Sequence, residues 1–349
     1  MMMDIKADQE LIPYRKKDKW GFCTLDKKIA IDYRFDNAEK FSEGLAPVEV
    51  NGKCGCINKS GEVIIPFNFD WIWGFKDGLA RVMLNDFFGC INKTGETVIP
   101  AKYDSTGIVS EGMVDLSLDG KHGYFNKISG KEIPLKYDYQ FPFKEGLAAV
   151  ELNDKWGFID KTDEVVIPFI YDDCKSFSDG LAAVRSDDKF GFIDKAGKVI
   201  IPFIYNKCNS FSEGLATVEL NDKFGFINKK GEIIIPLKFI NHGYSFLDAL
   251  FSEELAPVIV KKKWVFINKT GDVIIPNNIL YTPTTWNLFS EGLVAVTLNN
   301  KEGFINKTGD VVTPFKYDDS KMFNGGLAEV ILNDQWGYID KSGNEFWED

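Results

Sequence analysis

A glycine that returns at a fixed interval dominates this sequence. In NDKWGFIDKTDEVVIP, residues 153–168, it follows a tryptophan, and between Gly21 and Gly225 it recurs every 34 residues. Two longer steps, of 40 and 38 residues, and a last step of 34 extend the series to the end of the chain. The ten positions are Gly21, Gly55, Gly89, Gly123, Gly157, Gly191, Gly225, Val265, Gly303 and Gly337.

This period replaces the two or three domains that 349 residues would otherwise suggest. We predict a short tail, residues 1–10, followed by a single array of ten repeats over residues 11–349. Two connections within the array are longer than the others, at residues 239–250 and 277–288.

One repeat, LAAVELNDKWGFIDKTDEVVIPFIYDDCKSFSDG (residues 147–180), contains three strand-like segments separated by tight turns. LAAVEL and KWGFID alternate in character, as expected for strands with one buried face. EVVIP is almost continuously apolar, which is typical of a strand covered on both faces. A proline that lacks the amide hydrogen is expected to end this third strand. The proline column is Pro66, Pro100, Pro134, Pro168, Pro202, Pro236, Pro276 and Pro314.

The glycine is kept in nine of the ten repeats, whereas the preceding position varies between aromatic, cysteine, histidine and glutamate residues. Glycine inside a strand usually marks a place where another group comes close. We therefore expect each glycine to accommodate an aromatic or backbone group from the neighbouring repeat.

The phrases NDKWGFIDK, VVIPFIYDD and FSDGLAAV, repeated in fixed order, resemble the WG repeat, also called the KWG repeat. The resemblance covers nearly the whole chain. It implies a β-rich array with an interaction role, and it brings no common catalytic activity and no cofactor.

We predict an all-β fold in which three-stranded antiparallel meanders of about 34 residues form an open β-repeat superhelix, or solenoid. One or two β-propellers are the alternative. Three strands in 34 residues are few for a propeller blade, which has four strands in roughly 40–50 residues. The chain also begins with a first strand, LIPYR, and ends in a third, NEFWED, so no split unit that would close a ring is evident.

The composition excludes several partners. With 41 basic and 52 acidic residues the net charge is −11, which opposes binding to nucleic acid or to an anionic membrane surface. No apolar run approaches the roughly 20 residues of a membrane span, and the N-terminus lacks a signal-peptide core. We therefore expect a cytoplasmic protein.

The six cysteines follow the repeat and are expected to be reduced; Cys56 with Cys90 and Cys174 with Cys208 are the pairs to test for disulfides.

An enzyme is not expected. The chain has two histidines, His122 in a tryptophan position and His242 in an insertion, and it has no nucleophile or phosphate-loop motif. Its carboxylates recur in columns, whereas an active site needs one asymmetric group. Turn capping explains the aspartate column better than a calcium ladder does, and a solvated turn explains the lysine column better than a basic stripe. We predict no cofactor and no metal.

Departures from the repeat give the candidate partner-binding residues. The two long connections contain His242, Tyr244, Phe246, Tyr281 and Trp286, and insertions in repeat arrays often lie on the binding face. Folding of these aromatic residues back onto the core is the alternative.

Further candidates lie within the regular repeats. Trp71 and Trp73 could stack on a sugar ring or anchor a peptide, with core packing as the alternative. Ile259 and Ile331 occupy a strand column whose residue type varies freely, which indicates that it faces solvent or a partner. The sequence thus predicts a non-catalytic scaffold for binding another protein, with a glycan-binding module as the alternative.

Overall fold

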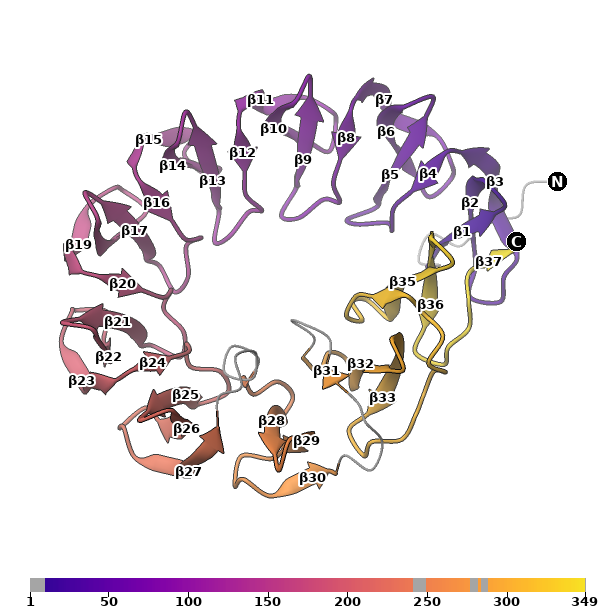
Figure 1. Cartoon of the computed structure of the whole chain (residues 1–349). Coiled ribbons are helices and arrows are strands. Elements are labelled where there is room, and N and C mark those ends of the chain that lie inside the picture. The colour runs from indigo at the N-terminus through magenta and orange to yellow at the C-terminus, as the bar shows by residue number, and fades with distance from the viewer. Residues whose placement is uncertain (1–9, 241–248, 277–281, 284–287, 349) are drawn as a thin grey trace. The chain divides into compact units, whose positions relative to one another are not determined.

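The computed structural model describes residues 10–240, 249–276, 282–283 and 288–348. All regular structure in these residues is β-strand, arranged in small open sheets (Figure 1). None of the described segments is a helix long and apolar enough to span a membrane. The chain divides into two compact units, Met1–Pro142 with Glu345–Asp349, and Phe143–Asn344. The array of repeats runs through both, and the second unit is inserted in the sequence of the first.

The strands of the first unit are β1 (Ile12–Lys16), β2 (Lys19–Cys23), β3 (Ile29–Phe35), β4 (Asn37–Ala38), β5 (Leu45–Val50), β6 (Lys53–Asn58), β7 (Val63–Phe69), β8 (Trp71–Ile72), β9 (Leu79–Leu84), β10 (Phe87–Asn92), β11 (Thr97–Tyr103), β12 (Ser105–Thr106), β13 (Met113–Leu118), β14 (Lys121–Asn126), β15 (Lys131–Tyr137), β16 (Tyr139–Gln140) and β37 (Trp347–Glu348).

The strands of the second unit are β17 (Ala148–Leu152), β18 (Lys155–Ile159), β19 (Val165–Tyr171), β20 (Asp173–Cys174), β21 (Ala182–Ser186), β22 (Lys189–Ile193), β23 (Val199–Tyr205), β24 (Lys207–Cys208), β25 (Leu215–Leu220), β26 (Lys223–Asn228), β27 (Ile233–Ile240), β28 (Ala256–Val260), β29 (Lys263–Ile267), β30 (Val273–Ile275), β31 (Thr282–Pro283), β32 (Leu293–Leu298), β33 (Lys301–Asn306), β34 (Asp319–Ser320), β35 (Leu327–Leu332) and β36 (Gln335–Asp340).

Most repeats build a four-stranded sheet, so the prediction of three strands was wrong. In the sheet β4-β5-β6-β7 the added strand is β4, whose two residues pair with the first long strand of the repeat. β4 comes from the connection between repeats, where the chain is extended and its backbone groups bond with β5. The sheet β28-β29-β30 has three strands in the described part of the chain.

The third strand continues through the proline, and the prediction that it ends there was also wrong. β19 contains Pro168 and pairs with β18 on both sides of it, as Phe158 with Ile167 and Trp156 with Tyr171. The register shifts between these pairs, so β19 bulges at the proline. A bulge on an edge strand leaves a residue outside the ladder, and proline is tolerated there.

The bulge explains the glycine. A Cβ atom on Gly157 would lie 2.7 Å from the carbonyl oxygen of Ile167 and 3.0 Å from Cδ1 of Phe169. The group that approaches the glycine therefore belongs to the third strand of the same repeat, and the prediction of a group from the neighbouring repeat was wrong. In the repeat that carries Val265, Ile275 pairs with Phe266 as Ile167 pairs with Phe158, and the position equivalent to Phe169 lies outside the described residues.

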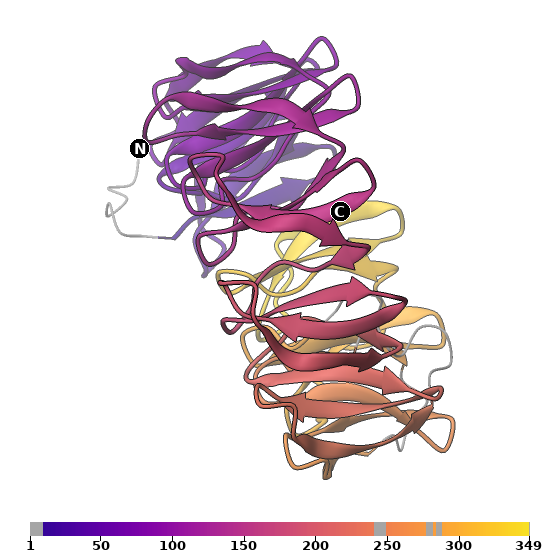
Figure 2. The ribbon, with the colours of Figure 1, turned by 90° about the vertical axis from the view of Figure 1, so that its left-hand side faces the viewer.

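Apolar side chains between consecutive sheets form the core, as predicted for stacked repeats. Phe192 and Ile201 of one sheet pack with Val218 and Ile227 of the next in one buried cluster. Figure 2 shows the sheets of the second unit stacked face to face. Because each sheet buries a face against its neighbours, stability depends on stacking.

The last strand of the chain completes the first sheet. β37 pairs in parallel with β1, and Nζ of Lys16 lies 3.0 Å from a carboxylate oxygen of Glu348. The chain therefore does contain a sheet assembled from its two ends. The sequence concealed it because NEFWED contributes only two residues to the pairing. The fold is an all-β tandem repeat of small open sheets that stack as in a solenoid.

We expect Gly157→Ala to lower the thermal unfolding midpoint, at a cost of about 2 to 3 kcal/mol, because the new methyl group meets the bulge of β19. Circular dichroism during heating measures this change.

The opposite exchange gives the control. Val265→Gly restores the common residue but removes a side chain that is buried in the core between two sheets, so it loses buried apolar surface and costs about 2 kcal/mol. A higher midpoint for Val265→Gly, or an unchanged midpoint for Gly157→Ala, would contradict this account of the glycine column.

Candidate functional site

An exposed apolar stripe follows the third strands of the second unit. Val165 and Val166 are 53% and 42% exposed, whereas the next residue, Ile167, is 1% exposed. The prediction that this strand is covered on both faces was therefore wrong, because the third strand forms the edge of its sheet. We call the exposed residues the outer-strand stripe; they are Val165, Val166, Ile170, Val199, Ile200, Ile204, Ile233, Ile234, Val273 and Ile274.

The stripe is interrupted in the first unit. Lys131 and Glu132 occupy the same two columns on β15, and both are exposed. The Glu132 carboxylate accepts a hydrogen bond of 2.8 Å from the Tyr103 hydroxyl of the preceding sheet. The fold therefore accepts charged residues at these positions, and the apolar residues of the second unit are not required by the strand itself.

A ladder of ion pairs links consecutive repeats at their acidic turns. The carboxylate of Glu145 accepts hydrogen bonds of 3.2 and 3.1 Å from the amide of Gly180, and Nζ of Lys195 lies 3.2 Å from it. The lysine column is thereby paired rather than presented as a basic stripe. The same pairing joins Lys93 to Glu43, Lys269 to Glu213, Lys307 to Glu253 and Lys341 to Glu291.

A second bridge uses the aspartate column. Asp70 binds Nζ of Lys53 at 2.5 Å and accepts a hydrogen bond of 2.6 Å from the amide of Asn85 in the next sheet. The hydrogen bond from Lys53 holds the pKa of Asp70 below its usual value. These carboxylates cap turns and bridge repeats, and no group of three or more His, Cys, Asp or Glu side chains in the described residues could hold a metal ion.

The aspartate bridge is replaced at one junction of the second unit. Ile240 stands in the aspartate column, directly opposite Lys223, and is 53% exposed. The facing turn of the next repeat holds Lys261 and Lys262, both with positive φ, where other repeats use mainly Asn, Asp or Gly. Neither lysine forms a salt bridge with a described acidic residue.

These departures surround a cavity of about 430 Å³, which we call the junction cavity. Such a volume is in the range of ligand pockets, roughly 300–1,000 Å³. Its lining is mainly apolar with lysines at one end: Lys238, Phe239, Ile240, Ile259, Val260, Lys261, Lys262, Ile267, Gly271 and Val273.

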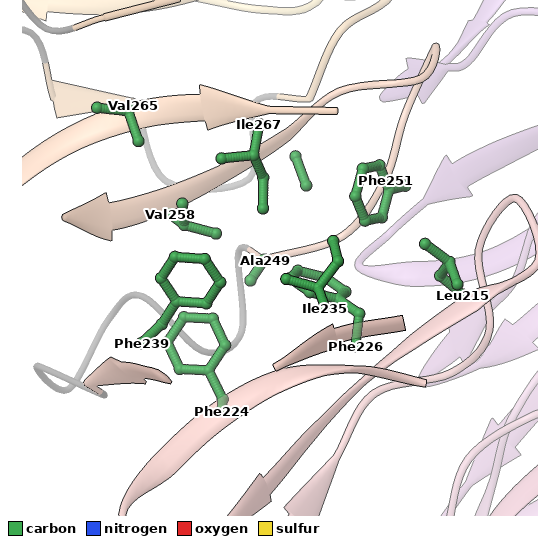
Figure 3. Close-up of a cluster of buried hydrophobic side chains, with 11 residues drawn as sticks. Leu215, Phe224, Phe226, Ile235, Phe239, Ala249, Phe251, Val258, Val265 and Ile267 are labelled. Carbon is green, nitrogen blue, oxygen red and sulfur yellow. The ribbon is translucent and has the colours of Figure 1, made fainter. Parts of the chain in front are cut away.

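The floor of the junction cavity belongs to the buried core between two sheets. Figure 3 shows Phe239 beside Phe224 and facing Val258, and the two phenyl rings are 5.4 Å apart. Val265, in the glycine column, lies in the same cluster. Nζ of Lys238 lies 5.4 Å from the Phe239 ring, where a cation interacts favourably with the ring electrons. The floor is thus buried and apolar, and the lysine end of the cavity is cationic.

The predicted site residues do not come together in one place. Ile259 lines the junction cavity, whereas Ile331 lies on another sheet, opposite Asp319. His242, Tyr244, Phe246, Tyr281 and Trp286 lie outside the described residues, so their role stays a prediction.

The variable strand column is covered more than the sequence predicts. Arg15 is 6% exposed and Glu219 is 4% exposed. Glu219 lies opposite Lys207 of the short strand β24, which covers it. The prediction that this column faces solvent or a partner was wrong for Arg15 and Glu219, since the added edge strand was not foreseen.

Trp71 and Trp73 are half-buried, with ring centroids 6.2 Å apart. Trp71 packs against a buried cluster, and the cavity beside it measures about 10 Å³, the space of one water molecule. The Arg81 guanidinium lies 4.3 Å from the ring centroids of both Trp73 and Phe88. A sugar would have to displace Arg81 from this face of Trp73, and glycan binding stays a prediction.

The groups that could support catalysis are dispersed. The His122 ring packs against the Tyr139 ring, with centroids 5.5 Å apart and a tilt of 46°, and burial lowers the pKa of His122. All six cysteines are free and buried, so the two candidate pairs, Cys56 with Cys90 and Cys174 with Cys208, do not form disulfides in the structure. Burial raises the pKa of the Cys56 thiol to about 12, so the nucleophilic thiolate is suppressed at neutral pH.

Asp115 is a buried carboxyl group that sequence reasoning missed. Its position on β13 corresponds to Ala149 and Ala183 in other repeats, and this change of residue type was the signal. Burial raises its pKa to about 7, and Oδ1 has no hydrogen-bond partner in the structure. The side chain lies against Gly107, whose added Cβ would be 2.8 Å from it.

Solved structures resemble this chain in fold. A crystal structure of the eukaryotic initiation factor aligns with 97% of this chain and 95% of its own, at 9% identity and a TM-score of 0.52. Hsv2p of Kluyveromyces lactis covers 78% of this chain and 93% of its own, at 8% identity and a TM-score of 0.42. At 9% identity the first likeness concerns the fold alone. No curated protein matches the chain.

The sheets, the bulged third strands and the inter-repeat bridges define a tandem β-repeat protein. The chain belongs to the family of WG containing repeat proteins, as the resemblance of its motifs indicated. The family matches most of the sequence, at residues 20–54, 55–86, 88–121, 123–156, 156–190, 190–224, 224–239 and 303–336.

We expect Ile240→Asp to stabilise the protein by up to about 1 kcal/mol, because the new carboxylate can bind Lys223 and the amide of the facing turn. The thermal midpoint should rise by roughly 2–4 °C. The reciprocal change, Asp172→Ile, removes the bridge to Lys155 and should lower it. A lower midpoint for Ile240→Asp would count against the assignment of Ile240 to the bridging column.

We expect Asp115→Ala to stabilise the protein above pH 7 by about 2 to 4 kcal/mol. The folded state keeps the proton to about pH 7, whereas an unfolded aspartate loses it near pH 4, so ionisation destabilises the wild type as pH rises between these values. The gain should therefore grow from pH 4 to 7 and then level off. Denaturant midpoints across this range measure it.

Glu329→Ala is the control for this pH dependence. Glu329 occupies the same column as Asp115, but its carboxylate binds Lys321, so its removal should give no gain. A gain from Asp115→Ala that is constant with pH would mean that the carboxyl group does not titrate in this window.

Proposed function

We propose that this WG-repeat protein is a non-catalytic scaffold that binds another protein along the outer-strand stripe of its second unit. The observation that carries the proposal is the exposure of paired apolar residues on four successive third strands, β19, β23, β27 and β30. Contiguous exposed apolar surface usually marks an interaction site.

The charged pair of β15 supports this function. Lys131 and Glu132 occupy the stripe columns on β15, so the sheet folds without apolar residues there. Exposed apolar residues that folding does not require are best explained by a partner. The junction cavity adjoins the stripe through Val273, so a partner lying on the stripe could also insert a side chain.

The edge position of these strands also supports binding to protein. An edge strand offers unpaired backbone groups, and the proline bulges of β19, β23 and β27 restrict regular pairing with another sheet. Partner side chains would therefore supply most contacts, and the surface favours packing over strand addition.

Catalysis is not part of the proposal. Among the described residues the carboxylates of the repeated columns cap turns and bridge repeats, and the His122 ring packs against Tyr139. We further propose that the protein acts without a cofactor. Glycan binding has no supporting observation beyond the two half-buried tryptophans.

The test replaces four residues of the stripe. The variant Val199→Lys, Ile200→Glu, Ile233→Lys and Ile234→Glu copies the charged pair of β15. It should fold, because Tyr171 and Tyr205 stand in the column of Tyr103, whose hydroxyl binds Glu132. Affinity capture from extracts of the source cells, with quantitative mass spectrometry, should then show loss of the partner by at least tenfold.

The matched control is Val63→Lys with Ile64→Glu, an equally exposed pair in the same columns of the first unit. It should retain the partner. Equal capture by the stripe variant, the control and the wild type would exclude the stripe as the binding surface. Equal thermal midpoints establish that the variants are folded.

A further inference from the structure

The junction cavity can be assigned a ligand chemistry, and this inference rests on the proposed function. Its lining consists of Phe239, Ile240, Ile259, Val260, Ile267 and Val273, with Lys238, Lys261 and Lys262 at one end. We propose that it binds an acidic peptide segment of a partner protein, with a large apolar side chain in the cavity and a carboxylate at the lysines.

The apolar wall of the cavity results from replacement of the bridging aspartate. At other junctions a carboxylate such as Asp70 spans two sheets and holds a lysine and a turn amide. At this junction Ile240 stands in its place, half-exposed at the wall of the cavity. Ile259 adds a further apolar wall in a column that holds Glu151 and Glu219 elsewhere.

The positive charge of the cavity comes from the turn between β28 and β29. Lys261 and Lys262 have φ values of 51° and 63°, a conformation that favours Asn, Asp and Gly. No other repeat has lysine at the second of these positions. Two lysines therefore stand where the turn itself favours other residues, and neither pairs with a described acid. In a protein of net charge −11, this local cationic end selects an anionic group.

The opposite end of the cavity gives the peptide a direction. Gly271 and Val273 line it there, beside the end of β29 that lies farthest from Lys261 and Lys262, and neither carries a charge. A ligand carboxylate would be attracted to the lysine end. The acidic residues of the segment should therefore lie on one side of its apolar anchor.

The occupant is a peptide because the cavity is continuous with the outer-strand stripe. Val273 belongs to both, and Ile233 and Ile234 lie on the strand that ends at Ile240. A chain that follows the stripe reaches the cavity without leaving the surface. Its apolar residues would contact the stripe before the anchor enters.

The test is selection from a random decapeptide library displayed on phage, with the full-length protein as bait. Counter-selection uses the variant Ile240→Asp, Lys261→Asn and Lys262→Asp, which restores the residues of ordinary junctions and is expected to fold. Peptides specific for the wild type should carry Leu, Ile or Phe beside Asp or Glu. In fluorescence anisotropy, the triple variant should bind them at least tenfold more weakly, and binding should weaken several-fold from 50 to 500 mM salt.

Asn153→Lys with Asp154→Lys is the matched control, because it places two lysines in the same turn of another repeat without the cavity. It should leave the affinity of the wild type unchanged. No enrichment over the triple variant, or enrichment of neutral or basic peptides, would overturn the proposal. Self-association of the wild type that Ile240→Asp abolishes would identify a second copy as the occupant and would also overturn it.

The stripe variants distinguish this inference from the proposed function. If the stripe variant loses the partner and the peptide selection fails, the scaffold function is supported and acidic-peptide binding in the cavity is excluded. If acidic peptides are selected and the stripe variant still captures the partner, peptide binding in the cavity is supported and the stripe is excluded as the binding surface.

Discussion

The close approach of a bulged third strand to a glycine is the interaction on which the rest of this structure depends. At Gly157 the carbonyl of Ile167 occupies the space that a side chain would need. The bulge bends the edge strand, accepts Pro168 and lets the chain continue to the connection that starts the next sheet. Glycine and proline therefore serve one geometric feature from opposite strands, which is why both recur with the same period.

Polar side chains then fix the spacing between sheets that the apolar core holds together. Glu145 and Lys195 join one acidic turn to the repeats beside it, and Asp70 joins a lysine of its own sheet to an amide of the next. Exposed ion pairs of this kind contribute little each. Here their carboxylates also accept hydrogen bonds from backbone amides, and so they fix the geometry of the turns.

The outer-strand stripe and the junction cavity arise where this pattern is relaxed. The stripe uses edge positions that one repeat of the first unit fills with Lys131 and Glu132, and the cavity appears where Ile240 replaces a bridging aspartate. Natural proteins commonly lose some stability at functional sites. The prolines protect the exposed edges from pairing with other sheets, so apolar residues can remain accessible there.

The sequence by itself determined the repeat, its family, the all-β class and the positions of turns, because these follow from local backbone preferences that return every 34 residues. Periodicity also identified Ile259 as a departure. Only the tertiary structure decided that the strand continues past Pro168, that Val165 is exposed, that Asp115 is buried and that β37 completes the sheet of β1. Each of these depends on which strand forms a sheet edge and which faces stack, and alternation along one strand does not contain that information.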